Sequence, residues 1–270
     1  MRRKQGHTRD HSRDNHSADS HIPRRAFLTG VSIAAAGLAV APLPLSRVAA
    51  QEKISSQEEM GLFETISSLR SMRRLKPDPI PEETLKKIIE AGIHAPSGGN
   101  MQEWGFILVQ DAERKRFIRD RYWATWQKLQ EGRPPINTLP PARQRTMKAA
   151  AYLAEHLHEV PVLLLACSLK EYPPWAATGN QRASVATMHG SIYPATQNIL
   201  LACRALGVGA TLTTTHYFFE EDLKQKFGVP DTMEIAALLP LGYPRGKFGK
   251  TTRKPVAEVL FWEQWGSKKS

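Results

Sequence analysis

Three arginines that follow one another closely in the sequence are the first candidates for chemistry. Arg70, Arg73 and Arg74 fall at positions i, i+3 and i+4, so a helix over residues 61–72 would present them on about one side. Guanidinium groups form paired hydrogen bonds with phosphate oxygens, and Ser71 adds a hydroxyl. The spacing therefore predicts an anion-binding site. The alternative is a solvated basic helix end, because cations also suit a helix C-terminus.

A glycine-rich loop with two amide side chains follows downstream, in the run Ala95–Trp104. Gly98 and Gly99 allow positive φ and a close approach of the backbone to a flat ligand. Asn100 and Gln102 add amide donors and acceptors beside that approach. The loop therefore predicts a contact with a flat, polar ligand. A tight helix-to-strand turn is the alternative, because turns have the same composition.

Together, the arginine–serine cluster and the Pro-Ser-Gly-Gly-Asn-x-Gln loop resemble the flavin-binding half of the nitroreductase family. The similarity continues through three shorter motifs and covers about residues 60 to 265. These motifs are Gly207-Val208-Gly209, Leu241-Gly242-Tyr243-Pro244 and Thr252-Arg253-Lys254-Pro255. None is specific alone, but their order and spacing along one chain support the resemblance. Leu69 is a departure, since the family often has a basic residue at that position.

The resemblance implies a bound FMN and assigns its binding residues one by one. Arg70, Ser71 and Arg253 would hold the phosphate. Arg73 or Arg74 would reach the ribityl chain and the pyrimidine edge of the flavin. The other residues that the resemblance places at the cofactor are Pro96, Ser97, Gly98, Asn100, Gln102, Thr214 and Thr215. The flavin carries the redox chemistry itself, so no catalytic acid–base pair of the protein is expected.

The resemblance also implies a homodimer with flavin sites between the two subunits. The loop residues Ser97, Asn100 and Gln102 would contact the pyrimidine ring, either within their own subunit or from the opposite one. The C-terminal segment 256–262 is expected to form a last strand that crosses to the partner and pairs with its sheet. A tail folded back on its own sheet is the alternative. The threonine run 213–215 falls where the family backbone approaches the hydride-carrying nitrogen, although such a run is equally typical of a strand.

The apolar pattern predicts an α+β domain over residues 51–270, with many helices and few strands. Strands are expected at residues 106–110, 160–169, 235–241 and 256–262. Helices are expected at 61–72, from Pro81 onward, from Asp111 toward Gln130, and at 143–158, 184–206 and 220–227. The proline-rich stretch 132–141 is expected to be an ordered loop or lid. The resemblance implies a nitroreductase-like fold, whose central sheet is mostly antiparallel and flanked by helices.

The positive charge of the chain does not indicate nucleic-acid binding. The formal net charge is +11, of which residues 1–50 contribute +5 through eight basic and three acidic side chains. The remaining basic residues are scattered or paired with acids, apart from the arginine cluster and the stretch 245–254, and there is no groove-reading motif. Cys167 and Cys203 have neither a disulfide framework nor metal-ligand spacing. We therefore expect no nucleic-acid partner and no metal.

Residues 1–50 are predicted to be a disordered leader that carries an export signal. Arg24 and Arg25 precede an apolar run over residues 27–41, which is shorter than the roughly 20 residues that span a bilayer. Val48-Ala49-Ala50 offers small residues to a signal peptidase. The segment resembles a twin-arginine signal. It implies passage through the twin-arginine translocase, cleavage near Ala50 and an exported, periplasmic or extracytoplasmic location, with an uncleaved membrane anchor as the alternative.

The function implied is that of an FMN-dependent oxidoreductase with ping-pong turnover. NAD(P)H or another small donor would reduce the flavin, and a nitroaromatic, quinone or similar acceptor would then take the electrons. Two alternatives stay open: a flavin-binding protein without NAD(P)H turnover, and a flavin-dependent oxidase or dehalogenase-like enzyme on the same fold. The lid between Arg121 and Pro141 would distinguish the second. His189, Tyr193 and His216 are weaker candidates as proton donors.

Overall fold

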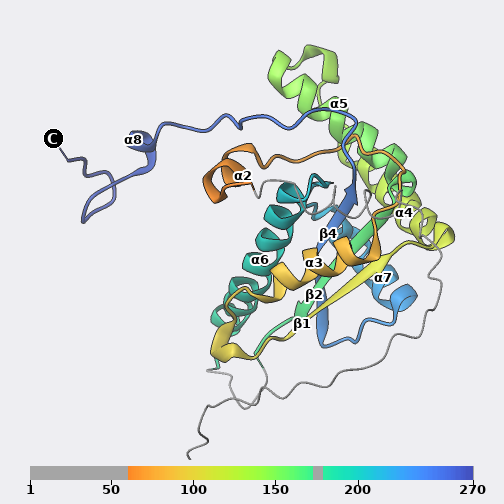
Figure 1. Cartoon of the computed structure of the whole chain (residues 1–270), viewed down its shortest axis with the longest axis horizontal. Coiled ribbons are helices and arrows are strands. Elements are labelled where there is room, and N and C mark those ends of the chain that lie inside the picture. The colour runs from red at the N-terminus through yellow and green to blue at the C-terminus, as the bar shows by residue number, and fades with distance from the viewer. Residues whose placement is uncertain (1–59, 173–178, 270) are drawn as a thin grey trace, which may run out of the picture. The chain divides into compact units, whose positions relative to one another are not determined.

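Four antiparallel strands form the sheet at the centre of the fold (Figure 1). The computed structural model describes residues 60–172 and 179–269, so the predicted leader lies outside the described residues. The strands are β1 (Trp104–Val109), β2 (Val162–Leu169), β3 (Gly209–Ala210) and β4 (Met233–Gly242). Their order is β1-β2-β4-β3, and each neighbouring pair is antiparallel. The prediction of an α+β fold with a mostly antiparallel sheet is confirmed.

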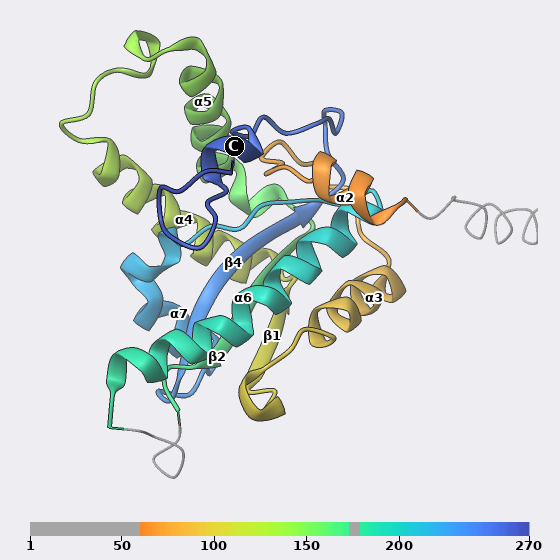
Figure 2. The same ribbon diagram turned by 90° about the vertical axis from the view of Figure 1, so that its left-hand side faces the viewer.

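Helices cover both faces of the sheet, because alternate side chains of each strand point to opposite sides. In β2, Val162 and Leu164 pack toward one face, whereas Leu163 and Leu165 pack toward the other. Figure 2 shows α3 (Glu82–Ile93) and α6 (Gln181–Ala205) on the first face. The helices α4 (Ala112–Gln130), α5 (Pro141–His156) and α7 (Glu220–Phe227) belong to the second. Both faces of β2 are therefore buried, as its apolar sequence predicts.

Local signals in the sequence set several helix ends. The side chain of Asp111 accepts a hydrogen bond from the Arg114 backbone N–H at 2.8 Å and caps α4. Gly228 ends α7 with φ of 67°. The remaining short elements are α2 (Leu62–Ser68), α8 (Val256–Val259), and the 3₁₀ turns η1 (Gly98–Asn100), η2 (Ile136–Thr138), η3 (Leu157–Glu159) and η4 (Thr215–Phe219). No helix in the described ranges is long and apolar enough to cross a membrane.

The arginine segment is not helical, which corrects the prediction of a helix over residues 61–72. α2 ends at Ser68, and the following residues are extended. The backbone N–H of Met72 donates to the Ala210 carbonyl at 2.9 Å, so the segment runs beside β3. Gly209 permits this approach, because a Cβ at that position would lie 2.8 Å from the Leu75 side chain. Long-range pairing therefore overrides the helical spacing of the arginines.

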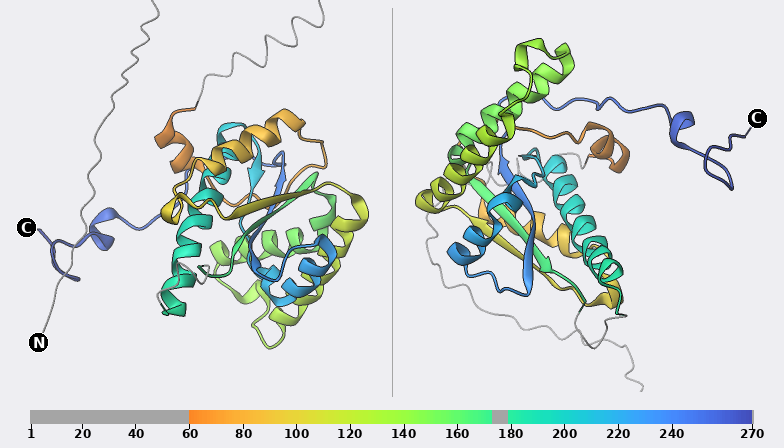
Figure 3. Two further views of the ribbon diagram at one scale, coloured as in Figure 1. Left: turned by 90° about the horizontal axis from the view of Figure 1, so that it is seen from below. Right: turned by 180° about the vertical axis from the view of Figure 1, so that it is seen from behind.

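The C-terminal segment is also not a strand within a single chain. Residues 256–259 form one helical turn, α8, instead of the predicted strand over residues 256–262. Val256 and Val259 are 69% and 60% exposed, and Trp265 is 92% exposed. Figure 3 shows this segment running away from the sheet. The ring of Trp265 packs only against that of Phe261 in the same segment, 4.7 Å between centroids, among the aromatic pairs of the described residues. An exchange of this segment between subunits stays a prediction.

Both cysteines are free and buried, one on each main layer of the fold. Cys167 lies in β2 and Cys203 lies near the end of α6. Burial raises the pKa of each thiol to about 12. Both are therefore uncharged at neutral pH, as expected for thiols with a packing role.

Candidate functional site

A cavity of about 520 Å³ lies beside the extended arginine segment. Arg70, Ser71 and Arg253, which the sequence assigns to one phosphate, all line it although they come from distant parts of the chain. Ile66, Leu69, Leu200, Ala210 and Leu212 give it apolar walls. The cavity therefore combines a cationic end with surfaces suited to a flat apolar ring.

A second cavity of about 480 Å³ adjoins the first. The two cavities share the residues Arg70, Ser71, Lys250, Thr251 and Arg253. The second cavity adds Arg73 and extends to one face of α5. The sequence analysis missed Lys250 and Thr251, although both precede the Thr252-Arg253 motif directly and are neighbours of a predicted site residue.

Two interactions hold the cationic walls in place. Thr251 donates to the Ser67 carbonyl through its backbone N–H at 3.0 Å and its hydroxyl at 3.2 Å, and so joins the C-terminal loop to the end of α2. The Nε of Arg204 donates to the Ser68 hydroxyl at 2.9 Å, and its guanidinium lies 4.2 Å from the centre of the Phe248 ring. Arg204 is buried. It therefore ties α6, α2 and the C-terminal loop together around the cavity.

The cations at these cavities lack acidic partners. None of Arg70, Arg73, Arg204, Lys250 and Arg253 takes part in an ion pair among the residues of known structure. Burial lowers the pKa of Arg73, an effect that the neighbouring Tyr122 opposes. An unpaired and partly desolvated cation raises the free energy of the folded state. A bound anion would remove that cost.

Arg74 takes a different position from its two neighbours. Its guanidinium lies 4.4 Å from the centre of the Tyr152 ring, and its backbone carbonyl accepts a hydrogen bond from the Arg245 N–H at 2.9 Å. Arg74 lines neither basic cavity. Of the arginines predicted to reach the flavin, Arg73 is therefore the one that this structure places at a cavity.

A buried hydroxyl without a partner marks the first cavity as a place for a ligand. Thr211 is 2% exposed and lines that cavity. Its Oγ1 has no hydrogen-bond partner among the described residues. Buried polar atoms are normally hydrogen-bonded, so an unpaired hydroxyl on a residue that lines a cavity is consistent with a contact that the described part of one chain does not supply. The hydroxyl, the unpaired cations and the apolar walls together suit FMN.

The loop that contains the predicted pyrimidine contacts lies at a different cavity. Ser97, Gly98 and Gln102 line a very small space of about 10 Å³, which shares no lining residue with the basic cavities. The Gly98 N–H donates to the Ser191 hydroxyl of α6 at 3.1 Å. The Gln102 N–H donates to the Ser97 hydroxyl at 3.1 Å. One chain therefore does not bring the loop and the arginines into a common site.

The backbone of this loop is held in an unusual conformation. Asn100 and Gln102 both have φ of 54°, and Gly99 has φ of 58°. A left-handed backbone is uncommon for a residue such as Gln102, and it persists only where neighbouring contacts fix it. A Cβ at Gly98 would meet the Tyr172 hydroxyl, so a larger residue there would displace that side chain. Pro96, which the resemblance places at the cofactor, lines neither basic cavity.

The threonine run lies next to the first cavity without lining it. Thr213 forms a bridge with Leu238 of β4, and its hydroxyl lies 2.8 Å from the Tyr122 hydroxyl. Thr214 and Thr215 line neither basic cavity, although both were predicted to lie at the flavin. Thr211 and Leu212, which directly precede the threonine run, line the first cavity. The strand interpretation of Thr213 therefore fits its pairing.

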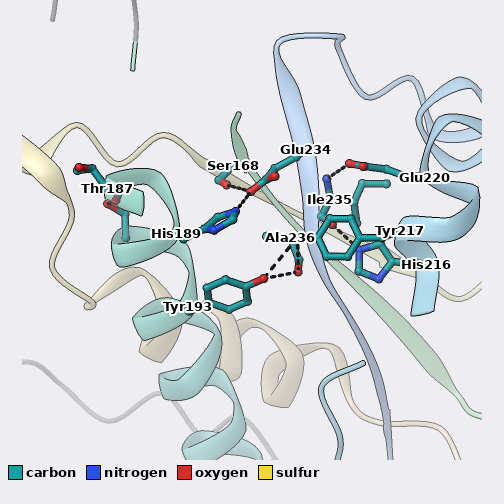
Figure 4. A network of polar contacts seen from close by, with 11 residues as sticks. Ser168, Thr187, His189, Tyr193, His216, Tyr217, Glu220, Glu234, Ile235 and Ala236 are labelled. Carbon is teal, nitrogen blue, oxygen red and sulfur yellow. Dashed lines mark hydrogen bonds and ion pairs between the residues drawn. The ribbon is translucent and has the colours of Figure 1, made fainter. Parts of the chain in front are cut away.

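Figure 4 shows a polar network between α6 and β4, beside the loop. The Nε2 of His189 lies 2.7 Å from Glu234 Oε1, and the Ser168 hydroxyl donates to the same oxygen at 3.5 Å. Burial raises the pKa of Glu234, and the adjacent His189 opposes that rise. Ser168 also lines the small cavity of the loop. Glu234 thus accepts hydrogen bonds from both α6 and β2 in this half of the network.

The second half of the network surrounds an irregularity in β4. The pairing of β2 with β4 skips Ala236, and its carbonyl accepts hydrogen bonds from Tyr193 at 3.1 Å and Tyr217 at 3.3 Å. The Nε2 of His216 donates to the Ile235 carbonyl. The extra residue of such a bulge is left out of the strand pairing, so its carbonyl can accept hydrogen bonds from side chains. Tyr193 and His216 therefore have structural partners.

Comparison with known proteins places this geometry in a family. Residues 66–243 match the model of the nitroreductase family. The chain is 32% identical to an NADH dehydrogenase of Thermus thermophilus, over 72% of this chain and 91% of that protein. The chain belongs to the nitroreductase family. The predicted resemblance is confirmed, and with it the general function of a flavoprotein oxidoreductase.

Other relatives extend the comparison. Iodotyrosine deiodinase 1 of Rattus norvegicus is 28% identical, over 71% of this chain and 64% of that protein. A structure of iodotyrosine deiodinase with FMN and 3-iodo-L-tyrosine is 23% identical, with a TM-score of 0.58 over 76% of this chain and 99% of the other. A nitroreductase of Bacteroides fragilis with bound FMN is 20% identical, with a TM-score of 0.53 over 76% and 100%. These two structures show the same fold.

Proposed function

We propose that the protein is an FMN-dependent oxidoreductase, which passes electrons in a ping-pong cycle from NAD(P)H or another donor to a nitroaromatic, quinone or similar acceptor. The observation that carries the proposal is the cavity beside Arg70, where cations without an ion pair among the described residues meet apolar walls and Thr211, whose buried hydroxyl has no partner there either. Two proteins of the same fold contain FMN. The complete G-x-G-x-x-G fingerprint of a dinucleotide site does not occur in the sequence, since Leu212 stands at the third glycine position after Gly207 and Gly209.

The residues of the chain bind and orient the cofactor. Arg70, Lys250 and Arg253 would hold its phosphate at the wall that the two cavities share, and Ser71 would add a hydroxyl contact. Bound FMN supplies the hydride and electron transfer. Arg73 would place positive charge near the bound molecule, and a cation close to the pyrimidine edge favours the anionic reduced flavin. No proton transfer by a protein side chain is needed.

The cofactor is tested by releasing it with heat and identifying it by chromatography. We expect FMN, and we expect Arg70→Ala and Arg253→Ala each to weaken its binding about tenfold to a hundredfold, because a charged hydrogen bond contributes roughly 1.5–3 kcal/mol. Arg143→Ala is the matched control, since Arg143 is exposed and lines neither cavity. Recovery of FAD, or a colourless protein that FMN does not reconstitute, would contradict the proposal.

We infer further that the active unit is a homodimer, in which the loop of one chain completes the cavity of the other. Two observations support this arrangement. The loop and the arginines lie at cavities without a common lining residue. The C-terminal segment exposes Val256, Val259 and Trp265 within a single chain. A large exposed apolar surface is typical of a protein interface.

Dehalogenation is a second candidate, favoured by the similarity to iodotyrosine deiodinases. The lid predicted to decide this question is the end of α4, the turn η2 and the start of α5. Anaerobic reduction of the bound flavin by NADPH, followed by addition of nitrobenzene or 3-iodotyrosine, separates the candidates. Reoxidation by nitrobenzene alone supports the nitroreductase, whereas iodide release supports the dehalogenase. A flavin that NAD(P)H never reduces supports a binding protein without that turnover.

Export through the twin-arginine route is proposed from the leader sequence alone. Replacing Arg24 and Arg25 by lysine keeps the charge and removes the recognised pair. We expect the wild type outside the cytoplasmic membrane with a mature N-terminus near Gln51, and the variant retained in the cytoplasm with its flavin. Fractionation and N-terminal sequencing check this. Normal export of the lysine variant would contradict it.

A further inference from the structure

Three segments of the chain meet at the second basic cavity, and all three are rich in cations. The arginine segment 69–76, the helix α5 and the C-terminal loop 243–255 line it together (Figure 1). The backbone N–H of Arg245 donates to the Arg74 carbonyl at 2.9 Å, and its Nε donates to the Leu75 carbonyl at 3.1 Å. These bonds hold the loop against the arginine segment. The charges of the three segments therefore act on one region of the surface.

These segments contain twelve basic side chains and one carboxylate. Four of the cations lie in the arginine segment, three in α5 and five in the C-terminal loop, whereas the carboxylate is Glu155 of α5. None of the twelve takes part in an ion pair among the described residues. All except Arg73 are exposed. The region therefore presents a large, uncompensated positive charge to solvent.

The cations of α4 are arranged differently, although that helix is also basic. Three of its arginines form ion pairs, namely Arg116 with Glu113, Arg119 with Asp120 and Arg121 with Asp222. The helices α3 and α7 each contain more acidic than basic residues. Like charges that lie close together repel one another and raise the free energy of the fold. The fold nevertheless gathers its cations around the cavity, without the carboxylates that accompany them on α4.

Bound FMN would neutralise only a part of this charge. Arg70, Lys250 and Arg253 would face its phosphate, and Arg73 would lie near the pyrimidine edge. A phosphate monoester carries about −1.5 to −2 at pH 7, and an anionic reduced flavin adds about −1. The three segments would therefore keep a net charge of about +8 in the loaded protein. Cations that have no part in holding FMN supply that remainder.

The walls of the cavities strengthen the field that these charges produce. Ile66, Leu69, Leu200 and Leu212 line the first cavity, which shares its cationic wall with the second. A cleft with apolar walls and charges of one sign focuses the electric field into its interior. It raises the local concentration of small molecules of the opposite charge, and association rates rise by about 10–10³. An anion is therefore drawn to the place where the flavin is proposed to lie.

We propose that the protein selects anionic electron acceptors, and that the cations around the second cavity attract them to the flavin. The acceptor class is a nitroaromatic or quinone that carries a carboxylate or sulfonate. The inference rests on the proposed function, because the acceptor takes its electrons from bound FMN. Arg143, Lys148 and Lys247 line neither basic cavity, so they contribute to this specificity through their charge and not through contact with the acceptor.

Stopped-flow reoxidation of the FMN-loaded full chain tests this preference without a nucleotide donor. The flavin is reduced with stoichiometric dithionite under argon and mixed with 4-nitrobenzoate or with neutral 4-nitrobenzamide. In either acceptor the nitro group takes two electrons and one proton from the reduced flavin and a second proton from solvent, and becomes a nitroso group and water. The two acceptors have similar size and reaction, so their charge is the main difference between them.

The salt dependence of the second-order rate constant is the deciding measurement. Raising the ionic strength from about 0.01 M to about 0.15 M shortens the Debye length from about 30 Å to about 8 Å. We expect the rate with 4-nitrobenzoate to fall about tenfold, and the rate with 4-nitrobenzamide to change by less than about twofold. The same salt dependence for both acceptors overturns the proposal.

Charge reversal outside the cavities assigns the effect to these segments. The double variant Arg143→Glu and Lys247→Glu should slow 4-nitrobenzoate about fivefold to tenfold at low ionic strength, and 4-nitrobenzamide by less than about twofold. The matched control is Lys87→Glu with Lys226→Glu, which makes the same change of charge at exposed positions of α3 and α7. It should alter neither rate by more than about twofold. Equal losses in the two variants overturn the proposal, because they would reflect net charge alone.

The proposed function and the charge preference fail in different ways. A protein that takes up no FMN, or whose reduced flavin neither acceptor reoxidises, contradicts both. Reoxidation by both acceptors with equal salt dependence overturns the charge preference alone. The conservative variant Arg143→Lys with Lys247→Arg should keep the wild-type rates, since it keeps the charges. A loss of rate in that variant also overturns the preference, because the shape of these side chains would then matter rather than their charge.

Discussion

The basic cavity and the loop Pro96–Gln102 differ in how their polar groups are satisfied. At the loop, Gly98 bonds to Ser191 and Gln102 bonds to Ser97 within the chain. At the basic cavity, the cations have no acidic partner among the described residues, and the Thr211 hydroxyl is unpaired. Of these groups, Arg73 is partly buried and the Thr211 hydroxyl is buried, and groups left unsatisfied in such places raise the free energy of the fold unless a ligand binds. The cavity is thus arranged to receive a molecule, whereas the loop presents a fixed shape.

This difference suggests distinct roles for two regions that the sequence assigns to one site. The cavity would bind the cofactor through its cations and its apolar walls. The loop of the partner subunit would form a rigid wall on the other side of the cofactor. Asn100 and Gln102 both have φ of 54°, a backbone conformation that costs free energy in residues other than glycine. The fold retains that conformation, as expected for a loop whose fixed shape serves binding.

The largest effect is expected from deleting residues 254–270. The deletion removes the apolar segment that includes Val256, Val259 and Trp265, and leaves Arg253 in the cavity. If that segment docks on a partner, the truncated chain loses the dimer and with it the second half of each flavin site. Sedimentation and the flavin absorbance of the purified protein are the measurements. A well-behaved yellow monomer would contradict the division between cavity and loop.

Mixing two defective chains tests the division directly. One chain carries Arg70→Ala and Arg253→Ala, which should weaken FMN binding about 10²–10⁴-fold at its own cavity. The other carries Asn100→Gly and Gln102→Gly, which remove the amides and keep the positive φ. If loop and cavity come from different chains, the mixed dimer has one intact site and binds FMN at half occupancy. If each site lies within one chain, the mixture has no intact site.

A smaller effect comes from removing one hydroxyl in each region. Ser68→Ala takes the acceptor from the buried Arg204, so we expect the free energy of unfolding to fall by about 1.5–3 kcal/mol. Ser191→Ala takes the acceptor from the neutral Gly98 N–H and should cost about 0.5–1.5 kcal/mol. Urea denaturation of both variants without cofactor gives the comparison. Equal losses of unfolding free energy in the two variants would show that the charge of Arg204 does not strengthen its hydrogen bond to Ser68.

The smallest effect concerns pH at the network of the loop region. The pKa of Glu234 is raised from 4.5 by burial, so its contribution to stability is fully present below the unfolded value and is lost as pH rises through the folded value. Glu159 has the opposite sign, because its hydrogen bond with His156 lowers its pKa. Glu234→Gln should therefore flatten the decline in stability just above pH 4.5. If the stability of this variant depends on pH as that of the wild type does, Glu234 does not have a raised pKa in the folded protein.

Sequence reasoning succeeded where the signal is local or periodic. Asp111 caps α4 and Gly228 ends α7 through contacts a few residues away. The continuous apolar run of β2 predicts burial on both of its faces, which the structure shows. The end of α2 was missed because Arg70, Arg73 and Arg74 have helical spacing, whereas the pairing of Met72 with Ala210 depends on residues far along the chain.

The candidate site shows the same limit. Arg70, Ser71 and Arg253 meet at one cavity, as the resemblance to the family implies. Lys250 and Thr251 were missed because a lysine in a polar loop has the same sequence signal whether it is solvated or lines a cavity. Arg204 was missed because a cation near a helix C-terminus is common for local reasons. Only the folded chain shows that its Nε donates to Ser68, far away in sequence.

The two buried cysteines can be used to measure how often the fold opens. Cys167 and Cys203 have pKa values of about 12 and lie in β2 and α6, so an alkylating reagent has no accessible thiolate in the closed fold. The rate of alkylation therefore measures how often the sheet and the central helix separate. It also means that a cysteine introduced on the surface would be the only fast-reacting thiol. A single dye placed on α5 could then follow cofactor loading without background labelling.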